Sequence, residues 1–167
     1  MRFFIKEIDE KYLPQIMQIQ ESVFEEGYSE KLLRRNSFAD FLEVFRHHHY
    51  VLGAFLGRAL VAFAILQVHP ENNEVLLSAG KSQLASKSSV VKTVIVKKEF
   101  RGYGLQKRFL LEFEKYDKKI GNLFELCSVA PDNSHSLTNF LQSGFAVEKK
   151  AKLYRKRSER LILCKSL

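Results

Sequence analysis

The chain has 167 residues, a mass of 19.4 kDa and a formal net charge of +8, which indicates a single, basic domain. Hydrophobic residues make up 46% of the sequence and charged residues 28%, so a disordered tail, a collagen-like fibre and a coiled coil are excluded. The longest apolar run, residues 59–66, is too short to cross a bilayer, and because charged residues stand among positions 1–10 we expect no export signal. We therefore expect one domain over residues 1–167, located in the cytoplasm and not in a membrane.

The start of the chain predicts a strand followed by two helices. Residues 3–8 form a β-prone run, and Asp9 is a suitable N-cap for a helix with apolar residues at helical spacing. Pro14 fits this helix only near its first turn, because proline lacks the backbone donor that a helix interior needs. Ser37 then opens a second stretch with apolar residues at helical spacing.

Two β-prone runs follow these helices, over residues 50–56 and 59–68. They are separated by Gly57 and Arg58, which is the length and chemistry of a tight hairpin turn, so we expect an antiparallel pair. Residues 78–89 are rich in Ser, Ala, Gly and Lys and show little periodicity. This composition predicts a surface connection with room for one helical turn.

The second half of the chain predicts alternating strands and helices that end in two strands. The run 90–96 is strongly β-branched, which is typical of a central strand. After it we expect a helix from 105 to 121, a strand over 123–129, a helix from 131 to 144, and strands at 145–147 and 161–164. The two cysteines, Cys127 and Cys164, lie in strand-like apolar stretches and are too few for a disulfide framework, so we expect buried thiols.

The positive charge is concentrated in the second half. Residues 1–88 hold ten basic and eleven acidic side chains, whereas residues 89–167 hold seventeen basic and eight acidic ones, most densely over 149–160. Such a surface suits a polyanionic cofactor, an acidic substrate, nucleic acid or simple solubility. Composition leaves these four alternatives open.

A glycine pair, Gly102 and Gly104, stands between a predicted strand and the helix after it. Neither residue has a Cβ, so the backbone can approach a ligand closely, and the first N–H groups of the helix have no intrahelical acceptor. Those donors and the helix dipole form an anion site, to which Arg101, Lys107 and Arg108 add charge that suits a pyrophosphate. On its own, the pattern also occurs in tight turns whose glycines serve only the backbone geometry.

Two other phosphate-binding motifs do not fit. A dinucleotide fingerprint would place its third glycine at position 107, which is lysine, although Glu125 stands near the place of that motif's acidic residue. The chain that remains after this unit is also too short for a doubly wound sheet. A Walker-type loop needs Gly-Lys-Ser or Gly-Lys-Thr after the turn, and neither is present.

Two motifs in this half stand in a fixed order. Residues 101–106 read Arg-Gly-Tyr-Gly-Leu-Gln, and residues 133–145 read Asn-x-x-Ser-x-x-x-Phe-x-x-x-Gly-Phe. They resemble the pyrophosphate loop and the following helix of the GNAT superfamily of acyl-CoA-dependent N-acetyltransferases, and the order of predicted elements agrees with that family over nearly the whole chain. The resemblance implies an α/β fold of three layers, in which about four helices flank a mixed central sheet of about seven strands.

The resemblance also implies acetyl-CoA as co-substrate, bound between the strands 90–96 and 123–129. Extended strand backbone can pair with the amides of pantetheine, and an exposed N–H there can hold the thioester oxygen as it becomes an oxyanion. The glycine loop would then cradle the pyrophosphate. The implied cofactor-binding residues are Val94, Ile95, Val96, Arg101, Gly102, Tyr103, Gly104, Leu105, Gln106, Lys107, Asn133 and Ser136.

Several positions depart from the family pattern. Gln106 stands where the family has Gly or Ala, and Phe140 where many members have a tyrosine proposed to protonate the leaving thiolate. The positions at which members often carry a catalytic glutamate hold Lys92 and Ser128, so bound water, another residue or an already neutral amine must replace a general base. Tyr154 is the best alternative proton donor, although such a tyrosine is more often a packed or surface aromatic.

Other candidate sites are less specific. Successive helical residues point about 100° apart, so the three histidines at 47–49 cannot all chelate one ion, and we expect a solvated helix end and no metal. Glu25, Glu26 and Tyr28 stand between the first two helices, where the family commonly forms part of the acceptor site. Two carboxylates there could hold a cationic amine, and a short acidic turn in water explains them equally well.

The implied function is transfer of an acetyl group from acetyl-CoA to a primary amine of a small molecule or peptide, by direct attack of the amine. The alternative is a catalytically degenerate domain that binds CoA or a regulatory partner, which the residues Phe140, Lys92 and Ser128 make credible. Nucleic-acid binding is less well supported, because the basic stretch lacks interleaved exposed aromatics and any groove-reading motif. The sequence is compatible with a homodimer.

Overall fold

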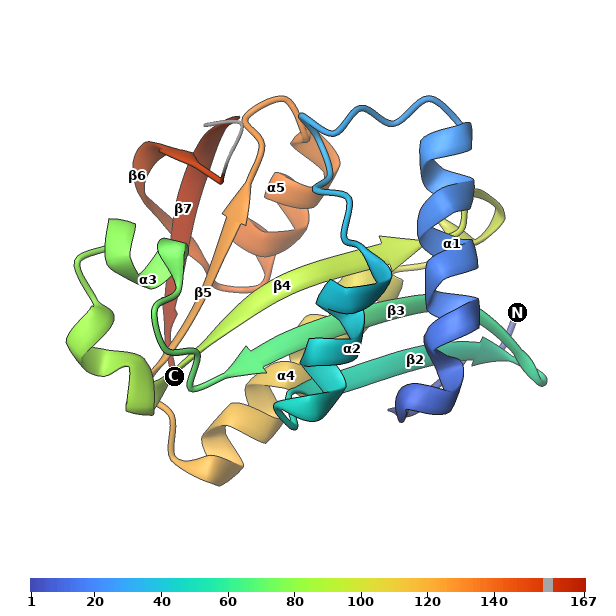
Figure 1. The fold of residues 1–167 in the computed structure, drawn as a ribbon, viewed down its shortest axis with the longest axis horizontal. Helices are drawn as coiled ribbons and strands as arrows, with labels where there is room; N and C mark the ends of the chain where they lie inside the picture. Colours follow the sequence, from blue (N-terminus) through green and yellow to red (C-terminus); the bar gives the residue numbers. More distant parts are fainter. Residues whose placement is uncertain (155–157) are drawn as a thin grey trace.

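The sheet at the centre of the computed structural model runs in the order β1-β2-β3-β4-β5-β7-β6 (Figure 1). The structure describes residues 1–154 and 158–167. Strands β4 and β5 are parallel and the other neighbouring pairs are antiparallel, so the sheet is mixed, as expected. The strands are β1 (Phe4–Glu7), β2 (Tyr50–Leu56), β3 (Ala59–Val68), β4 (Ser88–Val96), β5 (Phe124–Val129), β6 (Ala146–Leu153) and β7 (Ser158–Ser166).

Helices cover both faces of this sheet, which confirms the predicted three-layer α/β fold. Helices α1 and α2 lie on one face, and α4 and α5 lie on the other (Figure 1). The helices are α1 (Leu13–Glu25), α2 (Phe38–Arg46), α3 (Glu74–Ser78), α4 (Leu105–Ile120) and α5 (Ser134–Gln142), so the short α3 is added to the expected four. Within the described residues, no helix is both long and apolar enough to cross a membrane.

The starts of the first two helices follow from their capping residues. Asp9 caps a single 3₁₀ turn, Glu10–Tyr12, and α1 continues directly from it with Pro14 at its start. Ser37 caps α2 through a reciprocal pair of hydrogen bonds with Asp40, in which each side chain accepts from the other residue's backbone N–H, at 3.1 and 2.7 Å. These bonds satisfy donors that the first helical turn would otherwise leave without an acceptor.

Two apolar layers hold the helices to the sheet. On one side Phe41 of α2 meets Phe63 of β3 edge to face, with ring centres 5.8 Å apart. On the other side Phe109 and Phe113 of α4 are fully buried against the sheet. Each such ring contributes roughly 2 to 3 kcal/mol through the apolar surface it removes from water. The two layers fix the positions of β4 and α4, and therefore of the glycine loop between them.

The connection before β4 is more structured than its composition predicts. Helix α3 and a 3₁₀ turn, Ser82–Lys87, occupy much of it. Asn73 begins α3, because its Oδ1 accepts from the N–H groups of Val75 and Leu76. Helix α3 was not predicted and lies almost wholly before residues 78–89, whereas the 3₁₀ turn lies within them, where a surface connection with one helical turn was expected.

The basic stretch near the end of the chain forms the hairpin of β6 and β7. Its exposed lysines lie on β6, as a solvated hairpin would place them. Arg155, Lys156 and Arg157, part of the predicted basic segment, lie outside the described residues. Cys127 and Cys164 are both free and buried, as predicted.

Candidate active site

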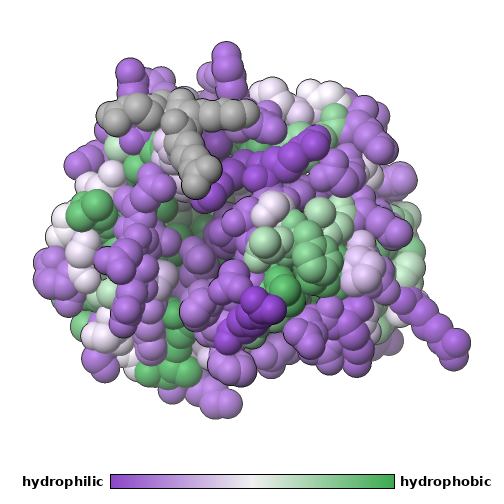
Figure 2. Space-filling model, viewed as in Figure 1, coloured by the Kyte–Doolittle hydropathy of each residue, from purple (hydrophilic) through white to green (hydrophobic). Residues whose placement is uncertain are grey.

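A cleft opens where β4 and β5 separate. The two strands pair from Ser88 with Phe124 to Val91 with Cys127 and make no further ladder contacts beyond that point. The resulting cleft has a volume of about 710 Å³. Figure 2 shows the face of the molecule that bears it, with hydrophilic residues around a hollow near the middle of the view. Of the residues considered from the sequence, Val94, Asn133, Ser136, Ser128, Phe140, Lys92 and Tyr154 line it.

A bulge in β4 directs its backbone toward this cleft. Leu66 of β3 faces Val91, and Ile65 faces Thr93, so Lys92 is an extra residue without a partner on β3. The N–H of Lys97 donates to Val61 of β3 at 3.0 Å. Because backbone direction alternates along a strand, the polar groups of Val94 and Val96 point away from β3 and toward the gap.

The glycine loop closes the far end of β4. Gly102 and Gly104 have φ values of +82° and +74°, in the left-handed region, and Gly104 is the N-cap of α4. A Cβ at either position would meet no atom within 4 Å, so the backbone conformation, and not crowding, requires glycine. The open space at the two glycines and the first N–H groups of α4, which have no intrahelical acceptor, together suit an anion.

The charged residues of this loop are partly used within the protein. Arg101 donates from Nε to the carbonyl of Val96 at 3.1 Å and forms an ion pair with Glu26 at 3.0 Å, and its guanidinium lies 5.0 Å from the ring centre of Tyr28. Arg108 donates to the carbonyl of Phe3 at 3.0 Å. Glu26 and Tyr28 therefore brace the glycine loop, and neither is among the residues that line the cleft.

Gln106 does not obstruct the loop. Its amide donates to Ser136 Oγ at 3.0 Å and accepts from Asn139 at 2.9 Å, so the side chain lies against α5. Asn133 caps α5, accepting from the N–H of Ser136 at 3.3 Å. The departure at Gln106 is thus accommodated by a link between α4 and α5.

Two of the implied cofactor residues, Ile95 and Leu105, have side chains directed into the core. Ile95 is buried among the residues of α1 and α2, and Leu105, the first residue of α4, is buried in the apolar layer between α4 and the sheet. Tyr103 is half exposed and meets Phe3 with ring centres 5.5 Å apart. Lys107 is exposed on the first turn of α4. Ile95 and Leu105 can therefore meet a ligand in the loop only through their backbone, whereas the side chains of Tyr103 and Lys107 are free to contact one.

Tyr154 reaches into the cleft from the turn after β6. Its hydroxyl lies 2.8 Å from Ser128 Oγ, and its N–H donates to Glu74 at 2.8 Å. Its backbone is left-handed, with φ of +65°. The guanidinium carbons of Arg34 and Arg160 lie 4.7 and 5.7 Å from its ring centre. The ring is therefore packed, and its hydroxyl is in the cleft.

Phe140 forms part of the apolar floor. It is buried and meets Phe145 edge to face, with ring centres 5.1 Å apart. It lines the cleft, but a phenyl ring has no proton to give. No tyrosine hydroxyl stands at this position, so Tyr154 is the tyrosine that lines the cleft in the described part of the chain.

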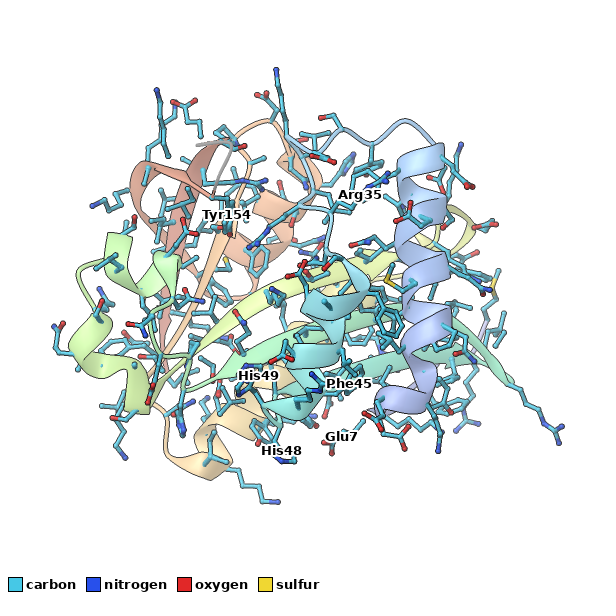
Figure 3. The ribbon with its side chains drawn as sticks, viewed as in Figure 1. Glu7, Arg35, Phe45, His48, His49 and Tyr154 are labelled. Carbon is cyan, nitrogen blue, oxygen red and sulfur yellow. The ribbon has the colours of Figure 1, made fainter. Side chains whose placement is uncertain are left out.

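The histidine triplet contributes to the cleft in a way that the sequence analysis missed. His49 is half-buried beside β3, where its Nδ1 accepts from the N–H of Val68 at 3.2 Å (Figure 3). Burial, together with the charges of His47 and Lys92, lowers the pKa of His49 to about 4. The prediction of a solvated helix end was thus wrong for His49. No group of three His, Cys, Asp or Glu side chains that could hold a metal occurs among residues 1–154 and 158–167.

Positive charge gathers on one side of the cleft. Burial and then the charge of Arg34 lower the pKa of Lys92, while Asp40 acts in the opposite direction. Burial also lowers the pKa of Arg160, and Arg34 adds to that effect. From the sequence, Arg160 was noted only as part of the basic stretch 149–160 and Arg34 was not considered, because only the fold brings them beside Tyr154.

Comparison with known proteins identifies a family. The acetyltransferase (GNAT) family model matches residues 13–145 of the chain. None of the curated protein sequences compared with the chain matches it.

Solved structures resemble the chain over its whole length. Ard1 from Thermoplasma volcanium aligns with a TM-score of 0.78 at 14% identity, over 100% of this chain and 99% of that one. PaiA N-acetyltransferase from Thermoplasma acidophilum, in complex with coenzyme A, aligns with a TM-score of 0.74 at 22% identity, over 100% of both chains. The ribosomal-protein-S18-alanine N-acetyltransferase from Escherichia coli aligns with a TM-score of 0.74 at 15% identity, over 99% of this chain and 94% of that one. At these identities the shared property is the fold.

Proposed function

The chain belongs to the GNAT family of acetyltransferases, and we propose that it transfers an acetyl group from acetyl-CoA to a primary amine of a small molecule or peptide. The observation that supports this most strongly is the separation of β4 from β5 beside an open glycine loop. Structures similar to this chain include a ribosomal-protein-S18-alanine N-acetyltransferase and a putative phosphinothricin N-acetyltransferase, so both peptide and small-molecule amines are reasonable acceptors.

The residues present fit acetyl-CoA as the co-substrate. The backbone groups of Val94 and the N–H of Val96 face the gap, where the amides of pantetheine can pair with them as an added strand would, while the carbonyl of Val96 already accepts from Arg101. The N–H groups from Gly102 into the first turn of α4 can hold the pyrophosphate, with the favourable end of the helix dipole behind them. Acetyl-CoA supplies a thioester carbon that an amine can attack.

The chemistry then follows from the groups around the cleft. The neutral amine attacks the thioester carbon, and a backbone N–H near Val94 stabilises the oxygen that becomes negative. The intermediate collapses as the bond between carbon and sulfur breaks, the amide remains on the acceptor, and the proton lost by the amine passes to water. Tyr154 donates a proton to the departing thiolate of CoA and regains one from water, which balances the proton lost by the amine, and Ser128 orients its hydroxyl.

The absence of a carboxylate at the family's usual positions changes how the amine is activated. Lys92 occupies one such position, and its positive charge disfavours an ammonium ion nearby. An acceptor bound beside Lys92 therefore loses its proton more easily than in water. Proximity to a cation thus compensates in part for the missing general base.

A thiol-release assay tests this function. Purified protein is given acetyl-CoA and a panel of primary amines, and free CoA is measured along with calorimetric binding of acetyl-CoA. We expect binding of acetyl-CoA and CoA release that depends on the amine. Binding without release on any amine would instead support the degenerate CoA-binding domain, for which Phe140 is the motivating departure.

A further inference from the structure

Three cations line the part of the cleft next to Tyr154. We call Arg34, Lys92 and Arg160 the cationic cluster. Arg34 comes from the segment between α1 and α2, Lys92 from the bulge in β4, and Arg160 from β7. Both guanidinium groups contact one ring, that of Tyr154, with their carbons 4.7 and 5.7 Å from its centre. Three separate elements thus bring positive charge to one place.

Among the described residues, no carboxylate forms an ion pair with the buried Arg160. Its side chain is 5% exposed, and its Nε is buried without a hydrogen-bond partner in the described residues. Among residues 1–154 and 158–167, none of the ion pairs includes a member of the cationic cluster. Burying a charge without a counter-ion is costly, so an anion that enters the cleft would relieve this cost.

The nearby carboxylates either accept a hydrogen bond from a backbone N–H or lie at the exposed rim of the cleft. Glu74 accepts the backbone N–H of Tyr154 at 2.8 Å, and Asp40 accepts that of Ser37 at 2.7 Å. Glu71 also lines the cleft but is exposed to solvent. Within the cluster, the charge of Arg34 lowers the pKa values of both Lys92 and Arg160, so the three cations repel one another. The cationic cluster therefore attracts an anionic ligand and repels a cationic one.

We propose that the acetyl acceptor is a small primary amine that carries a carboxylate, and that Arg34 and Arg160 bind this carboxylate. The proposal rests on the proposed function and names the acceptor class for the same site. Guanidinium groups suit the task because their planar donors match the two oxygens of a carboxylate. The cleft, at about 710 Å³, is in the size range of small-molecule sites.

The same cluster excludes other amines. A polyamine would bring further positive charge against Arg34, Lys92 and Arg160, which costs binding energy because like charges repel. A carboxylate held by the two arginines leaves Lys92 to face the rest of the acceptor, including its amine. The cationic cluster therefore selects the acceptor by charge and promotes its neutral amine form.

The first experiment compares amino acids with their own carboxamides. Phenylalanine, β-alanine and 4-aminobutyrate are each paired with the matching amide, and kcat/KM is measured with saturating acetyl-CoA. For the α-amino acid, the amide has the less basic amine and is more often neutral, so simple amine reactivity favours the amide. We expect the acid of the best pair to exceed its amide at least tenfold in kcat/KM. Equal or faster turnover of the amides would overturn the proposal while leaving acetyl transfer itself intact.

The second experiment removes one member of the cluster. Arg34 is exposed, so Arg34→Gln is expected to fold, and Arg35→Gln is its matched control. The Arg35 guanidinium forms an ion pair with Glu21 at 3.3 Å and lies 4.2 Å from the ring centre of Phe24, away from Tyr154 (Figure 3). Arg34→Gln should raise KM for the acid about tenfold and leave KM for the amide and affinity for acetyl-CoA unchanged. Arg35→Gln should match the parent in all three measurements.

A binding measurement separates this proposal from the proposed function. Thermal shift with the amino acid in the presence of CoA reports the carboxylate site without any turnover. Stabilisation by the acid, absent with the amide and lost in Arg34→Gln and Arg160→Met, is expected even if catalysis is undetectable. If the acid and the amide stabilise the protein equally, the carboxylate site is wrong; failure of acetyl-CoA to bind or release CoA would instead overturn the proposed function.

Discussion

The hydroxyls of Ser128 and Tyr154 lie 2.8 Å apart, joining β5 to the turn after β6. The backbone of Tyr154 is held in place as well, because its N–H donates to Glu74 of α3. The hydroxyl is thus fixed at the wall of the cleft on the side opposite β4. A proton donor for a leaving thiolate needs such fixed placement, because proton transfer depends on hydrogen-bond distance.

Tyr154→Phe tests this role by removing only the hydroxyl. If the hydroxyl protonates the thiolate, kcat should fall about 10²-fold with little change in affinity for acetyl-CoA, because the packed ring remains. Steady-state kinetics and calorimetry give both values. Ser128→Ala is the companion variant, expected to lower kcat less because it leaves the donor in place. Unchanged turnover in Tyr154→Phe would leave water or the acceptor as the proton source.

Gly104→Val tests the glycine loop. Valine is strained at φ of +74° and its side chain would fill the space that the pyrophosphate needs, so affinity for acetyl-CoA should fall at least about tenfold. Gly121→Val is the matched control, since Gly121 ends the same helix with φ of +78° and lies at its other end. It should lose stability without losing affinity. If Gly104→Val and the parent bind acetyl-CoA with equal affinity in calorimetry, the glycine loop does not bind the pyrophosphate.

Several features of the fold follow from short-range sequence signals. The hairpin of β2 and β3 has the predicted bounds, because Gly57-Arg58 and the apolar runs beside it are local. The N-cap role of Ser37 is local in the same sense. Helix α3 was missed because its signal, Asn73 before two buried residues, stands just ahead of a Ser- and Gly-rich run.

The side-chain contacts of the candidate active site were harder to predict from the sequence than the fold was. The resemblance placed Val94, Asn133 and Ser136, which do lie in the cleft. The resemblance could not reveal that the Arg101 side chain forms an ion pair with Glu26, because this contact depends on how the segment after α1 passes the glycine loop. Arg34 and Arg160 meet only through the fold, and neither stands in a motif. Long-range side-chain pairing is therefore what the sequence analysis lacked.

Lys92→Gln tests the activation of the amine. A cation near the acceptor disfavours its ammonium form and lowers its pKa, so removing the charge should raise that pKa. The rising limb of kcat/KM against pH should then move to higher pH by about one unit, as expected for charges several ångströms apart at a protein surface. Lys87→Gln, at the end of a 3₁₀ turn, serves as the control. A pH profile identical to that of the parent would remove Lys92 from this role.

A buried pair of carboxyl groups supports β5 and predicts a pH-dependent stability. Asp117 accepts from Ser89 at 2.7 Å and from Asn122 at 2.8 Å, while Glu125 is fully buried beside it. Burial, and then the neighbouring charge of Asp117, raise the pKa of Glu125 well above its ordinary value. The neutral form is therefore favoured in the folded state, so stability is greatest below the unfolded pKa and falls as pH rises toward the folded pKa.

Glu125→Gln should remove much of that dependence, because glutamine resembles the protonated side chain. Each unit by which the folded pKa exceeds the unfolded one corresponds to about 1.4 kcal/mol of stability lost as pH rises through that interval. The variant should lose less stability than the parent between pH 5 and pH 8 in urea denaturation. Glu112→Gln, which removes an exposed partner of Lys115, should behave like the parent. An identical loss in the Glu125 variant would show that Glu125 is ionised in the fold.

The most direct test of the account is a crystal structure of the protein grown with acetyl-CoA. We expect pantetheine density along the backbone of Val94 and Val96 and a pyrophosphate against the N–H groups from Gly102 to the first turn of α4. The acetyl group should lie in the cleft, facing Tyr154 and Lys92. Acetyl-CoA bound outside the gap between β4 and β5, or a gap that stays empty at saturating acetyl-CoA, would contradict it.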